Sequence, residues 1–289
     1  MSRIWEAWRT TSGESTTTAE RHDDSPEVTL RRYPQEVRRA GVAAAPPVVD
    51  RLPHKTIAAP RTGARPALGP LPAEHGRKLV ISNRANPVAV EQYRRLAATV
   101  HELQVEQGLR TLMVTSAVPG EGKTLTAVNL ALTLSEACER RVVLIDADLR
   151  RPCIHQILQL PNARGLSDAL CDNGESPLMQ VSEFLSVLPA GPTTEPLSLT
   201  SERMRRLVDE YAASFDWVLL DAAPVGFMSD ARLLARLTRA VLFVIASHIT
   251  PHSLVSRAIA EIGEECIIGT VLNRVEAQDI PAAGYYQDY

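Results

Sequence analysis

The chain has 289 residues, of which 45% are hydrophobic and 22% charged, and its formal net charge is −3. This composition is normal for a soluble globular protein, and the charge gives no indication of nucleic-acid binding. No apolar run approaches the roughly 18 residues of a membrane-spanning helix, and the start of the chain lacks the apolar core of a signal peptide. The four cysteines show no metal-site spacing. We expect them to be small core residues or free thiols in a reducing compartment, and we therefore expect a cytoplasmic protein.

Residues 1–85 are basic and rich in proline and small residues. They carry 14 Lys/Arg and 9 Asp/Glu, which leaves 17 and 25 for the remainder of the chain. Such a segment buries too little apolar surface to offset its ordering entropy, so we expect a largely disordered arm. A short helix is expected at its tip, where Ile4, Trp5 and Trp8 share one face. The arm either contacts a partner, an anionic membrane or the acidic body, or remains solvated.

From residue 86 onward, buried apolar runs alternate with segments of helical length. The predicted elements, in chain order, are strand 110–117, helix 123–137, strand 141–148, strand 182–190, helix 201–215, strand 217–223, helix 229–238, strand 240–247, a helix that begins at Thr250 (N-cap) and Pro251 and stops at Gly263, and strand 267–275. Strands that alternate with helices in this way predict a three-layer α/β fold with a mostly parallel sheet.

The segment TSAVPGEGKT (115–124) joins the first predicted strand to a helix, which is where a phosphate-binding loop lies. Backbone N–H groups of such a turn form an anion-binding nest, and Gly120 and Gly122 let the main chain approach phosphate closely. Lys123 would neutralise phosphates and the Thr124 hydroxyl would ligate Mg²⁺, as in P-loop NTPases. The alternative is an ordinary turn with an incidental GKT. The predicted nucleotide-binding residues are Ala117, Val118, Pro119, Gly120, Glu121, Gly122, Lys123, Thr124 and Leu125.

Carboxylates follow two further predicted strands. VVLIDADLRRP places Asp146 and Asp148 at the end of one strand, and WVLLDAAP places Asp221 at the end of another. Ligands of open α/β sheets bind at the carboxyl ends of strands, and a magnesium-binding carboxylate occupies such a position in P-loop enzymes. A single acid at a strand end is often a helix cap. Three acids in a chain that also has GKT are expected to cluster near the metal.

The combination of PGEGKT, LIDADLR, LLDAAP and the closing GYYQDY resembles the bacterial tyrosine kinases, often called BY-kinases. The glycine-rich loop, HRD and DFG motifs of eukaryotic protein kinases do not occur in the chain. The resemblance implies an enzyme that uses ATP and Mg²⁺ and regulates capsule or exopolysaccharide synthesis. It implies a P-loop kinase domain over residues 86–280 and a tyrosine-rich tail over residues 281–289.

The resemblance also assigns roles to individual residues. The family's D-x-D-x-R element is matched by Asp146, Asp148 and Arg150, and Asp146 would position and deprotonate the attacking tyrosine hydroxyl. Asp148 and Asp221 would hold the metal or its waters. The expected catalytic residues are Lys123, Asp146, Asp148 and Arg150. The expected metal-binding residues are Thr124, Asp146, Asp148 and Asp221.

Three of the six tyrosines, Tyr285, Tyr286 and Tyr289, lie within the last five residues. A short terminal segment can reach another active site, and the resemblance implies phosphorylation of these tyrosines on a neighbouring subunit. Each phosphate adds roughly −1.5 to −2 charges, so we expect phosphorylation to favour dissociation of an oligomer. The alternative is that the terminal tyrosines pack on the body of the protein.

The segment VEQYRRLAATV resembles the family's E-x-x-R-x-x-R oligomerisation helix through Glu91 and Arg94, but its third position is Ala97. We therefore expect self-association. The missing arginine argues against a closed ring, and the choice between a ring and another oligomer stays open. The chain resembles family members whose kinase and membrane activator are separate polypeptides. That implies a membrane polysaccharide co-polymerase, or chain-length regulator, as activator and recruiter to the inner face of the membrane. A tyrosine phosphatase is a further expected partner, and nucleic acid is not.

Two other functions remain open. A MinD/ParA-like ATPase switch has the same sheet, but its KGGxGK[ST] loop carries a leading lysine where this chain has Val118. A nucleotide-binding scaffold without catalysis is the second alternative. Phosphotyrosine on the purified chain would distinguish the kinase from both.

Overall fold

The computed structural model describes residues 78–82, 85–171, 177–192, 199, 202–227 and 229–275. The predicted helix at the chain's start, most of the predicted arm and the three tail tyrosines lie outside the described residues, so these expectations stay predictions.

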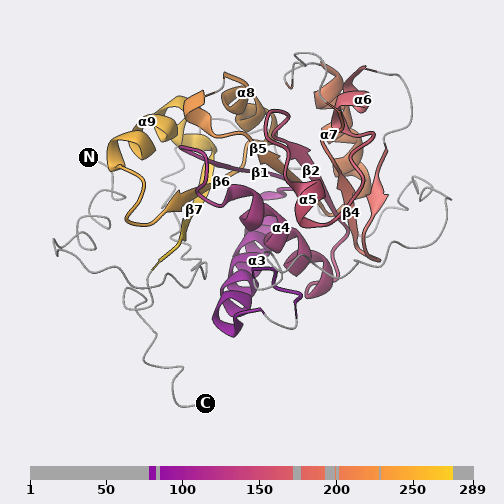
Figure 1. The fold of residues 1–289 in the computed structure, drawn as a ribbon, viewed down its shortest axis with the longest axis horizontal. Coiled ribbons are helices and arrows are strands. Elements are labelled where there is room, and N and C mark those ends of the chain that lie inside the picture. Colours follow the sequence, from indigo (N-terminus) through magenta and orange to yellow (C-terminus); the bar gives the residue numbers. More distant parts are fainter. Residues whose placement is uncertain are drawn as a thin grey trace.

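A seven-stranded sheet forms the centre of the domain, with strand order β3-β4-β2-β5-β1-β6-β7 (Figure 1). Neighbouring strands are parallel except β3 and β4, which pair antiparallel at one edge. The strands are β1 (Thr111–Ser116), β2 (Val142–Ala147), β3 (Met179–Gln180), β4 (Leu185–Leu188), β5 (Trp217–Ala222), β6 (Val241–Ala246) and β7 (Ile267–Asn273). Because parallel strands share direction, the loops that follow β1, β2, β5, β6 and β7 all leave the same edge of the sheet.

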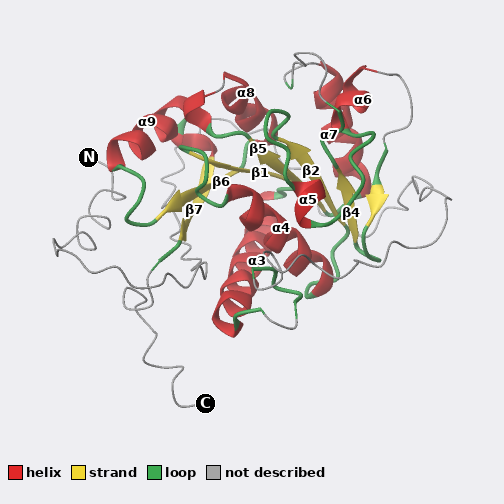
Figure 2. Cartoon of the chain, in the orientation of Figure 1, coloured by secondary structure: helices red, strands yellow, loops and turns green. Residues whose placement is uncertain are grey.

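Helices cover both faces of this sheet, with α3 and α4 on one side and α8 and α9 on the other (Figure 2). The helices are α3 (Pro87–Gln107), α4 (Lys123–Glu136), α5 (Ile154–Ile157), α6 (Leu166–Cys171), α7 (Glu202–Ser214), α8 (Ser229–Thr238) and α9 (His252–Ile262), with 3-10 turns η1 (Val225–Phe227) and η2 (Glu264–Cys266). None of the helices in the described ranges has the length and apolar character needed to cross a bilayer.

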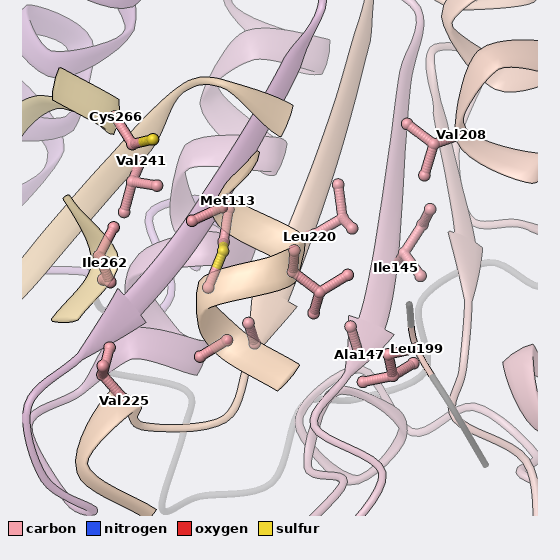
Figure 3. Close-up of a cluster of buried hydrophobic side chains, with 14 of the residues drawn as sticks. Met113, Ile145, Ala147, Leu199, Val208, Leu220, Val225, Val241, Ile262 and Cys266 are labelled. Atoms are coloured by element: carbon pink, nitrogen blue, oxygen red, sulfur yellow. The ribbon is translucent and has the colours of Figure 1, made fainter. Parts of the chain in front are cut away.

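Alternate residues of the central strands face the two helical layers. Met113 of β1 belongs to the core beneath α7, α8 and α9, whereas Leu112 and Val114 belong to the core beneath α3 and α4. Figure 3 shows Met113, Leu220 and Ile145 in the first of these cores, on the neighbouring strands β1, β5 and β2. Burial on both faces explains why these strands read as continuous apolar runs. The predicted three-layer α/β fold is confirmed.

The long predicted strands and helices agree with the structure to within a few residues, but short elements were missed. The motif 90–100 predicts only the middle of α3, and nothing in the sequence predicts α5, α6 or β3. The strand predicted from residue 182 begins at Leu185, because residues 182–184 form the turn that reverses the chain between β3 and β4. Elements of two to six residues carry too little periodicity to be recognised from sequence.

The predicted N-terminus of the last helix was wrong. α9 begins at His252 with Pro251 at the N-cap, and no side chain caps it. The Thr250 hydroxyl instead donates to Glu121 Oε1, 2.6 Å away in the loop after β1. A threonine just before a proline is a common N-cap, so the local sequence favours this assignment. In the fold, the Thr250 hydroxyl forms a charge-assisted hydrogen bond with a buried carboxylate instead.

Residues 78–82, which lie within the predicted arm, pack on the domain. The Leu79 side chain is fully buried in the core beneath α3 and α4. Asn129 of α4 secures the main chain on both sides of it, accepting from the Val80 N–H at 3.1 Å and donating to the Lys78 carbonyl at 2.8 Å. The same helix begins at the phosphate loop, so this short segment is attached directly to the element that carries the candidate site.

Candidate active site

The loop between β1 and α4 has the backbone conformation that a phosphate-binding loop requires. Gly120 and Gly122 have φ values of 86° and 91°, in the region that favours glycine. A Cβ on Gly122 would overlap the side-chain amide of Asn273, so this position also lacks room for a larger residue. Behind the loop, α4 starts at Lys123 and directs the positive end of its dipole toward the loop.

Lys123 lies among the carboxylates that the sequence predicted. Its Nζ is 2.8 Å from Asp148 Oδ2, 3.6 Å from Asp221 Oδ1 and 3.1 Å from the Thr124 hydroxyl. Burial lowers the pKa of Lys123, but the charges of Asp221 and Asp148 outweigh that effect and raise the pKa on balance. The ammonium group therefore stays charged and lies within reach of the loop.

Asp146 and Asp221 lie side by side, because β2 and β5 pair in parallel with these two residues in register. Both side chains are fully buried. Burial and the neighbouring charge of Asp221 raise the pKa of Asp146 to about 8. Burial also raises the pKa of Asp221 to about 6, although the Lys123 charge opposes the shift. Two adjacent carboxylates thus hold protons far more readily than exposed ones do.

The buried carboxylate oxygens are only partly hydrogen-bonded. Asp146 Oδ2 accepts from the N–H groups of Cys153 and Ile154, each at 3.1 Å. Asp146 Oδ1 and both oxygens of Asp221 have no hydrogen-bond partner within the described part of the chain. Buried oxygens without a hydrogen bond are costly, although Lys123 forms an ion pair with Asp221 Oδ1 at 3.6 Å. Hard oxygen ligands are what Mg²⁺ prefers, so this donor set fits a magnesium ion.

The carboxylates do not form a complete protein cage for a metal. In the ranges that the structure describes, no three Asp, Glu, His or Cys side chains are placed to hold an ion together. Mg²⁺ commonly takes only one or two carboxylates and completes its shell with phosphate oxygens and water. Which of Thr124, Asp146, Asp148 and Asp221 would contact the metal stays a prediction.

Three other predicted site residues are exposed or half-buried, namely Arg150, Glu91 and Arg94. Arg150 is exposed in the turn that follows β2, and its catalytic role stays a prediction. On α3, Glu91 pairs with Arg95 at 3.3 Å and Arg94 is exposed. Ala97, the third position of the oligomerisation motif, is fully buried in the core beneath α3 and α4.

Sequence reasoning assigned no role to two residues that contact the phosphate loop. Asn273, at the end of β7, donates to the Glu121 carbonyl at 2.8 Å, and Arg274 donates to the Gly120 carbonyl at 2.8 Å. They lie in the segment VLNRV, more than 140 residues from the loop. Only the position of β7 beside β6 brings them there, so no local pattern could have revealed their contacts.

Comparison with known proteins places the chain among nucleotide-binding proteins. Residues 112–284 match the family model of the CobQ/CobB/MinD/ParA nucleotide binding domain. The tyrosine-protein kinase YwqD of Bacillus subtilis is 30% identical over 217 residues, which cover 73% of this chain and 91% of that protein. This chain belongs to the bacterial tyrosine-protein kinase family. The tyrosine-protein kinase etk of Escherichia coli is likewise 30% identical, over 72% of this chain but only 29% of that longer relative.

Solved structures agree with membership of the tyrosine-protein kinase family. The chimerical protein CapA2B2 superimposes with a TM-score of 0.63 and 28% identity over 73% of this chain and 94% of that one. The kinase domain of the E. coli tyrosine kinase ETK gives a TM-score of 0.61 and 29% identity, over 68% and 79% of the two chains. The septum site-determining protein MinD of Pyrococcus horikoshii gives 0.50 at 22% identity over 62% and 78%, which shows a shared fold alone.

Proposed function

We propose that this member of the family is an ATP-dependent tyrosine autokinase that phosphorylates Tyr285, Tyr286 and Tyr289 of a neighbouring copy. The observation that carries the proposal is the buried cluster of Lys123 and three aspartates beside a phosphate loop, in a chain whose relatives are named tyrosine-protein kinases. The tail tyrosines lie outside the described residues, and their role rests on their position in the sequence.

Asp146 is the proposed base. In the transfer step the phenol oxygen attacks the γ-phosphorus, the bond between that phosphorus and the β–γ bridging oxygen breaks, and ADP leaves. The phenol proton passes to the ionised carboxylate of Asp146. Because the pKa of Asp146 is about 8 in the free protein, its own proton must leave first, and the positive charge of bound Mg²⁺ would favour that loss. Bound Mg²⁺ would neutralise charge on the phosphates.

Lys123 supplies the second positive charge in this proposal. In the free protein its Nζ pairs with Asp148 at 2.8 Å, and the γ-phosphate would compete with that carboxylate for it. The N–H groups of the loop and the N-terminus of α4 would orient the phosphate chain. Phosphoryl transfer depends mainly on such positioning and charge stabilisation, which these groups are arranged to supply.

The wider role that we propose is control of exopolysaccharide or capsule synthesis. The succinoglycan biosynthesis transport protein ExoP of Rhizobium meliloti is 28% identical over 69% of this chain, which spans 26% of ExoP. We propose that a membrane polysaccharide co-polymerase activates this kinase and recruits it to the membrane, and that a tyrosine phosphatase reverses the modification. Multiple phosphates on the tail would repel a neighbouring acidic subunit and weaken self-association.

Intact-mass measurement after incubation with Mg-ATP tests the proposal. Wild-type protein should gain whole phosphates, while Lys123→Met and a variant with phenylalanine at all three tail tyrosines should not. Mixing the tail variant, which keeps its active site, with Lys123→Met, which keeps its tail, should place phosphate on Lys123→Met if transfer occurs between copies. ATP hydrolysis without any mass gain, even with the cytoplasmic segment of the co-polymerase, would indicate a MinD/ParA-like switch instead.

A further inference from the structure

Glu121 lies within the phosphate loop, yet its side chain points into the protein and is buried, with 1% exposure. The carboxylate accepts three hydrogen bonds. Oε2 accepts from the Val118 N–H at 2.8 Å, and Oε1 accepts from the Ala246 N–H at 3.2 Å and from the Thr250 hydroxyl at 2.6 Å. Val118 belongs to the loop itself, whereas the other two donors lie at the end of β6 and in the turn before α9. Glu121 therefore connects the loop to a separate part of the sheet edge.

The main chain of the same loop is held from β7. Asn273 donates to the Glu121 carbonyl and Arg274 to the Gly120 carbonyl, each at 2.8 Å. None of the described peptide bonds is cis, and a trans peptide is planar with its N–H opposite its carbonyl. Holding these two carbonyls toward β7 therefore directs the N–H groups of Glu121 and Gly122 away from β7. Backbone N–H groups with fixed directions are what an anion-binding nest requires.

The charge of Glu121 does not serve phosphate binding directly. A buried carboxylate repels a nearby phosphate, because like charges interact strongly where water is excluded. Hydrogen bonds to an ionised acceptor are, however, stronger than neutral ones, and this carboxylate has three. The benefit of the residue must therefore come from the geometry that it imposes on the loop.

We propose that Glu121 is a positioning residue that, with Thr250, Asn273 and Arg274, holds the phosphate loop in its anion-binding shape before nucleotide arrives. Groups that are fixed in advance bind a ligand without the cost of ordering them. The inference deepens the proposed function, since it rests on binding of a nucleotide by this loop, but it does not depend on transfer to tyrosine.

Paired substitutions at Thr250 give the sharpest test. Thr250→Val keeps the shape of the side chain and removes the hydroxyl that reaches Glu121, whereas Thr250→Ser keeps the hydroxyl. The affinity of the full chain for ADP and for adenosine would be measured by competition against a fluorescent ADP analogue. We expect Thr250→Val to weaken ADP binding by up to about tenfold, with Thr250→Ser close to wild type. Tenfold is the limit that is reached if the energy of one charge-assisted hydrogen bond goes entirely into holding the loop in its binding shape. The affinity for adenosine, which has no phosphate for the loop to bind, should change by less than about twofold if the effect is confined to phosphate binding.

Two further variants keep the test decisive if Thr250→Val is poorly folded. Glu121→Gln should weaken ADP binding by at least as much as Thr250→Val. The carboxylate accepts hydrogen bonds at both oxygens, and the glutamine amide would place an N–H₂ group against one set of those donors. Arg274→Gln should weaken ADP by about threefold without lowering the melting temperature, because Arg274 is exposed. Wild-type ADP affinity in all three variants, whatever their melting temperatures, would overturn the proposal. A lower melting temperature in Thr250→Val and Glu121→Gln alone would then make Glu121 a structural residue only.

Failure of this inference can be told apart from failure of the proposed function. ADP binding is measured without tyrosine transfer, so a chain that gains no phosphate but shows the expected loss of ADP affinity would leave the positioning role intact. A chain that phosphorylates its tail, with ADP affinity insensitive to all three substitutions, would retain the kinase function and refute the positioning role.

Discussion

Asp146→Asn is expected to stabilise the free protein at alkaline pH. The folded chain raises the pKa of Asp146 to about 8, whereas an unfolded chain leaves it near its ordinary value of about 3.9. Between these values the folded state holds a proton that the unfolded state has lost. Stability therefore falls as pH rises through this window and stops falling once pH exceeds the folded pKa. Asparagine does not titrate and removes this dependence.

The magnitude follows from the pKa. With a folded pKa of about 8, Asp146 should lower the free energy of unfolding of the wild type by about 2 kcal/mol from pH 6 to pH 8, and Asp146→Asn should lack this decrease. Asp221, with a pKa of about 6, changes little over the same interval, so the effect reports mainly on Asp146. Urea unfolding of wild type and Asp146→Asn at both pH values, in EDTA and without nucleotide, would measure the difference.

Asp209→Asn is a suitable control, because Asp209 is exposed on α7 and its removal should leave the pH dependence of the wild type unchanged. If wild type and Asp146→Asn lost stability in parallel from pH 6 to pH 8, the buried pair would not share a proton in the free protein. The proposed strength of Asp146 as a base would then be unsupported.

Three other substitutions test the packing around the site. Leu79→Ala should lower the free energy of unfolding by about 2–5 kcal/mol in urea titration, because the residue is fully buried, and a smaller loss would show that the segment 78–82 is only loosely attached. Gly122→Ala should abolish measurable ADP binding, because the new Cβ has no room and φ is 91°. Gly108→Ala is the control: it has open space around it, so it should cost about 1 kcal/mol of stability and leave ADP affinity unchanged. Ala97→Arg should destabilise the domain by about 3 kcal/mol or more by burying a charge, and Ala98→Arg on the exposed face should not; similar melting temperatures would contradict the burial of Ala97.

Local patterns in the sequence were sufficient for most of the fold and for the phosphate loop. The strands beneath both helical layers are continuous apolar runs, and GEGKT between a strand and a helix specifies a loop whose glycines adopt positive φ. These features depend on residues within about ten positions of each other, so a single sequence displays them. The tyrosine-kinase family could be inferred from the same short motifs.

Tertiary structure alone decided which distant groups meet. Asp146 and Asp221 lie side by side because β2 and β5 are neighbours in register, although 75 residues separate them. Glu121 reads as an ordinary loop residue, and Thr250 as a helix cap, until the fold places one against the other. Strand order determines these contacts, and it depends on how all the apolar faces pack together, which no local pattern encodes.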